Sequence, residues 1–168
     1  MTDGFLEKTS CGDRWRNFAG SYKGDIVNGE PHGRGILTGR MGGEGGPDKS
    51  VVYNGQWNDG KIHGRGTLTI EDSIIYEGGF AACYKDGKGK LTDTKLNYTE
   101  EGEWKQDRLV RGSLRLADGR WFDGEWRVSY SNSYPTKGIL GAADGTQQAV
   151  EFDGSTFMSA LSWPRPPN

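Results

Sequence analysis

The residues of this chain that could act as catalysts or metal ligands are few and scattered. His32 and His63 are the two histidines, and each opens the same phrase, His-Gly-Arg-Gly. Neither has a cysteine or a second histidine at ligand spacing, so we expect both to serve the repeat rather than a metal. The adjacent acids Glu100 and Glu101 point to opposite faces of a strand and cannot share a substrate. We therefore expect no enzyme activity, no cofactor and no metal.

One segment comes close to a phosphate-binding loop. Residues 43–50 have the sequence GEGGPDKS, which keeps the G-x-x-x-x-G-K-[ST] spacing but places Asp48 where the last glycine belongs. A carboxylate there would repel phosphate, and the residues that follow indicate a strand, whereas the motif needs a helix N-terminus. We interpret the segment as a flexible connector.

Charge and cysteine content exclude several classes of protein. The 21 basic and 23 acidic side chains are mixed along the chain and leave a net charge of −2, so nucleic acid is not an expected partner. Neither a membrane-spanning apolar run nor a signal-peptide pattern is present. Cys11 and Cys83 are too few and too far apart to staple a domain of this size, so we expect free thiols. The expected location is the cytoplasm, in contact with the cytoskeleton or a membrane surface.

A repeated phrase of alternating aromatic residues and glycines organises the chain. The clearest copy, YNGQWNDGKIHGRGTL, covers residues 53–68, and related phrases begin at Tyr22, Tyr76, Tyr98 and Trp121. The 28 glycines are far more than average usage provides, so they need a structural reason. Anchor glycines recur at a period of about 23 residues with two insertions, and they are Gly24, Gly55, Gly78, Gly102, Gly124 and Gly154.

The alternation predicts β-strands, because successive side chains of a strand point to opposite faces. Asn28-Gly29 and Asp59-Gly60 separate the two halves of their copies and predict two-residue type I′ hairpins. Strict pairing from Asp59-Gly60 sets Gly55 opposite Gly64 and Tyr53 opposite Gly66. A ring of one strand can then lie over a glycine of the other, which explains the glycines.

The aromatic residues of all copies are expected to share one face of the sheet, opposite the polar face that carries the histidines. We predict that this face binds a partner, through Tyr22, Tyr53, Trp57, Tyr76, Phe80, Tyr98, Trp104, Phe122 and Trp126, with Ile26 beside them.

The phrase resembles the MORN (membrane occupation and recognition nexus) repeat, which has Tyr-x-Gly-x-Trp, a glycine three residues on, and then His-Gly-x-Gly. The copy at 53–68 matches every element, whereas the first copy has Ile26 for Trp. The third has Phe80 for Trp, Cys83 for the turn glycine and Asp86 for His. The resemblance covers residues 22 to about 154. It implies an all-β fold, a single elongated twisted antiparallel sheet of consecutive hairpins, and a role in protein scaffolding, membrane association or the cradling of helices in a groove.

Three regions are expected along the chain. Residues 1–21 form an N-terminal extension and the start of the first strand. Residues 22–154 form the repeat array of about six hairpins, with insertions at 38–50 and 127–137. Residues 155–168 form a cap or tail, in which a short helical turn ended by Pro164 either caps the last hairpin or folds back on the aromatic face.

The function expected from these features is a scaffold or adaptor that binds a helix or peptide of a partner protein. A one-layer sheet exposes its apolar face, and the sequence holds no helix long enough to cover it. Two alternatives stay open. One is a peripheral membrane module that binds anionic lipid headgroups through basic side chains of the polar face. The other is a homodimer in which two apolar faces or two array ends bury each other.

Overall fold

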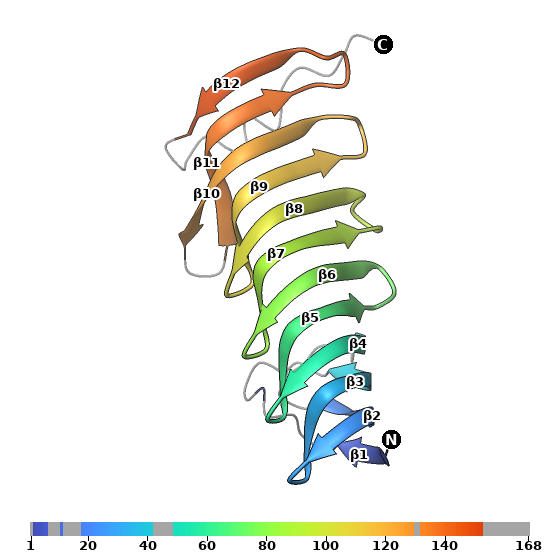
Figure 1. Cartoon of the computed structure of the whole chain (residues 1–168). Helices are drawn as coiled ribbons and strands as arrows, with labels where there is room; N and C mark the ends of the chain where they lie inside the picture. Colours follow the sequence, from blue (N-terminus) through green and yellow to red (C-terminus); the bar gives the residue numbers. More distant parts are fainter. Residues whose placement is uncertain (1, 7–10, 12–17, 42–48, 130–131, 153–168) are drawn as a thin grey trace.

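The chain folds as one antiparallel sheet. The computed structural model describes residues 2–6, 11, 18–41, 49–129 and 132–152, and twelve strands lie in chain order within these ranges. They form an elongated, twisted ladder (Figure 1). The strands are β1 (Thr2–Leu6), β2 (Phe18–Val27), β3 (Glu30–Met41), β4 (Lys49–Asn58), β5 (Lys61–Ile70), β6 (Ile74–Ala81), β7 (Tyr84–Asp93), β8 (Tyr98–Lys105), β9 (Arg108–Leu116), β10 (Trp121–Ser129), β11 (Asn132–Gly141) and β12 (Gln147–Glu151).

The predicted all-β fold of consecutive hairpins is therefore confirmed. The helical turn expected within 155–168 lies outside the described residues. Strand β1, which pairs with β2, was not anticipated from the sequence. Among the described residues there is no helix long and apolar enough to cross a bilayer.

A column of ten paired glycines crosses the sheet from β2 to β11. Members on neighbouring strands lie directly opposite each other, and they are Gly24, Gly35, Gly55, Gly66, Gly78, Gly89, Gly102, Gly112, Gly124 and Gly138. Rings fill the space that the missing side chains leave. A Cβ atom added at Gly66 would lie 2.5 Å from Cε2 of Tyr53. The predicted stacking of Tyr53 over Gly66 is thus confirmed.

The strict register expected for the β4–β5 hairpin is wrong. Gly55 lies opposite Gly66, and Tyr53 lies opposite Leu68, because the ladder shifts at a β-bulge between Gly55 and Trp57. Gly64 takes the positive φ of 66° that this bulge requires, a conformation that glycine adopts without steric cost.

Side chains of the preceding strand complete these bulges. The backbone N–H of Arg65 donates to Oε1 of Gln56 at 2.7 Å, and that of Arg34 donates to Oδ2 of Asp25 at 3.2 Å. The backbone groups that the bulge releases from the ladder are satisfied in this way. The His-Gly pair of the repeat therefore marks a bulge, at which its glycine adopts a positive φ.

The aromatic face forms the core of the protein. Neighbouring rings meet edge to face, and the contact from Tyr53 to Trp57 has a centroid distance of 5.3 Å. The indole N–H groups of Trp57, Trp104 and Trp126 also donate to a glycine carbonyl of the preceding hairpin, as Nε1 of Trp57 does to Gly35 at 3.2 Å. These contacts fasten one hairpin to the next. The ladder of edge-to-face pairs runs through Tyr22, Trp57, Tyr53, Phe80, Tyr76 and Trp104.

The two cysteines are not free thiols, which corrects the expectation from the sequence. Cys11 and Cys83 form a disulfide with a Cα–Cα distance of 5.6 Å. The two cysteines are 72 residues apart in the sequence, and the sequence alone does not show that the fold brings them together. The fold brings residue 11 to the turn between β6 and β7, where Cys83 is buried.

Gly66→Val is expected to lower the free energy of unfolding by about 1 to 3 kcal/mol, although valine has the higher strand propensity. The added side chain would meet the ring of Tyr53, which neighbouring rings hold in place. Arg65→Val, on the exposed polar face, is the matched control and should leave stability nearly unchanged. Chemical denaturation measures both, and equal losses at the two positions would contradict the assigned faces.

Candidate functional site

The predicted partner-binding rings lie together, but they are not exposed. Eight of the nine have exposed fractions between 0% and 8%, and only Tyr98 is half-buried. They pack on the glycine column, on one another and on partly buried residues such as Leu68, Ile70 and Phe152. The premise of an exposed aromatic surface is wrong. Contact of these rings with a partner stays an untested prediction, and it would require the core to open.

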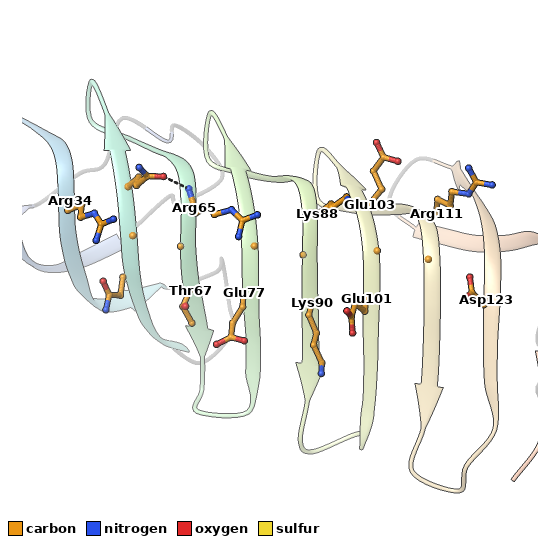
Figure 2. A pocket seen from close by; sticks show the side chains of 18 residues that line it. Arg34, Arg65, Thr67, Glu77, Lys88, Lys90, Glu101, Glu103, Arg111 and Asp123 are labelled. Carbon is orange, nitrogen blue, oxygen red and sulfur yellow. Dashed lines mark hydrogen bonds between the residues drawn. The ribbon is translucent and has the colours of Figure 1, made fainter.

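The other face of the sheet carries a groove. Side chains on either side of the glycine column line a hollow of about 1100 Å³ that runs across the strands from β3 to β10. We call it the glycine groove, because six glycines form its floor: Gly55, Gly66, Gly78, Gly89, Gly102 and Gly112. Figure 2 shows its labelled side chains in two rows along the floor. One row holds Arg34, Arg65, Lys88, Glu103 and Arg111, and the other holds Thr67, Glu77, Lys90, Glu101 and Asp123.

The repeat itself places a base in this groove once per hairpin. Return strands β3, β5, β7 and β9 each carry a basic residue directly before the column glycine, namely Arg34, Arg65, Lys88 and Arg111. In the phrase His-Gly-x-Gly this is the variable position. The recurring base was therefore visible in the sequence. The pairing of the glycines, which form the floor of the groove, could be seen only in the structure of the sheet.

The histidines lie near the hairpin tips. His32 and His63 line a second, smaller depression with Asp25 and Gln56. Nδ1 of His32 is 3.5 Å from Oδ1 of Asp59 in the next hairpin. Among the described residues, no group of three His, Cys, Asp or Glu side chains could hold a metal ion. The contact of His32 with Asp59 agrees with a structural role at the hairpin tip.

The fourth copy departs from the others on the aromatic face. Glu100 stands two residues before its column glycine, the place that Tyr53 holds in the second copy, whereas Tyr98 lies one pair further along and faces Leu116. Burial raises the pKa of the Glu100 carboxyl, and the charge of Lys85 acts in the opposite direction. Nζ of Lys85 lies 4.2 Å from the centroid of the Trp104 ring. A carboxyl group thus stands where the other copies place a ring of the core.

Glu100→Gln is expected to stabilise the protein at pH 7. A raised pKa in the folded chain means that protonated Glu100 stabilises the fold at pH values below the unfolded pKa, and that this stabilisation is lost as the pH rises through the folded pKa. The advantage of Glu100→Gln should therefore disappear below pH ~4. Denaturation curves at both pH values test this.

Glu101→Gln is the matched control, since Glu101 is exposed on the opposite face. It should change stability little at either pH. An equal gain from both substitutions would mean that removal of any acid stabilises the sheet, and that Glu100 has no special environment.

Comparison with known proteins agrees with this geometry. The MORN repeat family model matches residues 22–44 and 53–73. Alsin of Rattus norvegicus is 35% identical over 81 residues, and Alsin of Homo sapiens is 33% identical over the same length. The matched part is 45% of this chain and 5% of each relative, so the chain spans only a small fraction of their length. MORN repeats are non-catalytic modules of protein or membrane interaction. The two family matches and the bulged hairpins that carry the same phrase show that residues 22–44 and 53–73 are MORN repeats.

Proposed function

We propose that this chain is a non-enzymatic scaffold or adaptor that holds a segment of a partner protein in the glycine groove. The single observation that supports this is the groove itself, a hollow with a floor of glycines and two rows of exposed polar side chains across eight strands. The core lies on the other face, so these rows are not part of it, although Gln56 in the lining accepts a hydrogen bond from the backbone of Arg65.

The dimensions of the groove fit a protein segment. Strands of a sheet lie about 4.8 Å apart, so the distance from β3 to β10 is roughly 34 Å. A helix of about 22 residues or an extended segment of about 10 residues has this length. The β-edges are at the two ends of the array, so a segment in the groove would be held by side chains and not by an added strand.

An anionic membrane is a weaker candidate for the same surface. The groove also holds acids such as Glu77, Glu101 and Glu103, which a negatively charged bilayer would repel. Flotation with anionic vesicles at low salt should therefore recover little protein. Strong, salt-sensitive flotation would favour the membrane function instead.

Capture experiments with charge-reversed variants test the protein-binding function. Arg65→Glu with Lys88→Glu changes the groove, and both side chains are exposed. Lys61→Glu with Lys105→Glu makes the same change of charge at exposed hairpin tips outside the groove. Proteins retained from lysate by the unchanged chain should be lost with the first pair and kept with the second. Retention of the same proteins by both pairs would rule out the groove as their binding site.

A further inference from the structure

The charges of the glycine groove are unevenly distributed along its length. From β3 to β7 its lining holds four bases and one acid, Arg34, Arg65, Lys88 and Lys90 against Glu77. From β8 to β10 it holds three acids and one base, Glu101, Glu103 and Asp123 against Arg111. The groove is therefore positive towards the N-terminal end of the array and negative towards its C-terminal end.

These charges are available to a ligand. All nine of the charged side chains in the lining are exposed. Across the described ranges, none of them takes part in an ion pair with another described residue. Lys88 and Lys90 face Glu103 and Glu101 where the two parts of the groove meet, between β7 and β8. Because none of these side chains is held in an ion pair, they can turn towards a segment that lies along the floor.

We propose that the occupant of the groove is a protein segment of opposite charge asymmetry, with its acidic part over β3–β7 and its basic part over β8–β10. This inference rests on the proposed function and specifies the partner. Complementary potentials along an elongated site fix the direction in which a segment lies, because the reversed direction places like charges together.

A second copy of this chain would be charge-complementary in an antiparallel arrangement, but its shape does not fit. Two grooves placed face to face meet only at their rows of side chains, and their glycine floors stay apart. A convex segment instead reaches the floor between the rows. An anionic bilayer fits the positive part of the groove and not the negative part.

Synthetic helices of about 22 residues, the length that spans the groove, provide the test. One peptide has glutamates in one half and lysines in the other, and its control has the same composition with the two residue types alternating. Both have the same net charge, so any difference reports charge order alone. At low salt we expect the block peptide to bind the whole chain roughly tenfold more tightly, measured by fluorescence anisotropy.

The direction of binding is read from a nitroxide label at the acidic end of the block peptide. It should broaden the amide NMR signal of Thr67, in the positive part, and leave that of Ser113, at the negative end, sharp. A variant with Arg65→Glu, Lys88→Glu, Glu101→Lys and Glu103→Lys should reverse the two effects.

Each other outcome decides between the two proposals. Equal affinity of block and alternating peptides, or broadening at Ser113 with the unchanged chain, overturns the charge asymmetry and leaves groove binding intact. If no peptide binds and the groove variants also keep their lysate partners, groove binding itself fails. If light scattering showed a stable dimer that does not bind the peptides, the occupant of the groove would be a second copy of the chain, and this inference would be overturned.

Discussion

Trp57→Ala is expected to lower the free energy of unfolding by about 4 kcal/mol, within the range for truncation of large buried side chains. Trp57 is 3% exposed, and its ring meets the rings of Tyr22 and Tyr53 edge to face, both at 5.3 Å. The substitution leaves a cavity between two hairpins and removes the hydrogen bond from the indole to Gly35. Equilibrium denaturation monitored by circular dichroism measures the loss.

Ile26→Ala provides the control at the same position of the first repeat. Ile26 follows Gly24 by two residues, as Trp57 follows Gly55, but it is 38% exposed. Its truncation should cost less than about 1 kcal/mol, because little buried area is lost. Equal and small effects at both positions would show that the ring ladder does not carry the stability of the array. Loss of partner capture in Trp57→Ala would report a lost contact only if circular dichroism showed the variant to be folded.

The sequence predicted the parts of the fold that depend on local alternation. The alternation of rings and glycines predicted that the ring of Tyr53 lies over Gly66, and the pair Asp59-Gly60 predicted the turn. The structure agrees with both predictions. The register failed because a β-bulge adds residues to one strand without changing the apolar pattern of either strand. His63-Gly64 was visible as a motif, but its glycine could be assigned to a bulge only from its positive φ.

The candidate site was harder to predict, because side-chain alternation gives the face of a residue and not its burial. The rings of Tyr76 and Phe80 were placed correctly on one face, yet the packing of each ring against its neighbours removes both from solvent. The glycine groove depends on the pairing of distant repeats. Arg34 and Arg65 lie in the same row only because the column glycines of their strands align.

Reduction of the Cys11–Cys83 disulfide is expected to lower the free energy of unfolding by about 4 kcal/mol in the chain-entropy model, since the bond closes a loop with a sequence separation of 72. The cross-link restricts the unfolded chain more strongly as the loop grows. Denaturation with and without a reductant measures the difference. Cys11→Ser should reproduce the reduced state in oxidising buffer. Identical curves for oxidised, reduced and Cys11→Ser protein would contradict the expected stabilisation by the bond.

Cys83→Gly separates the cross-link from the strain of the turn. Cys83 has a φ of 70°, and it occupies the second turn position that Gly60 fills in the preceding hairpin, with the same backbone hydrogen bond to the hairpin before it. A non-glycine residue in this conformation costs about 1 to 2 kcal/mol. In oxidising buffer Cys83→Gly should be less stable than the unchanged chain, because the cross-link is lost. In reductant it should be at least as stable, because glycine removes the strain. A variant that is less stable in both buffers would mean that packing of the buried Cys83 side chain outweighs the strain of its backbone.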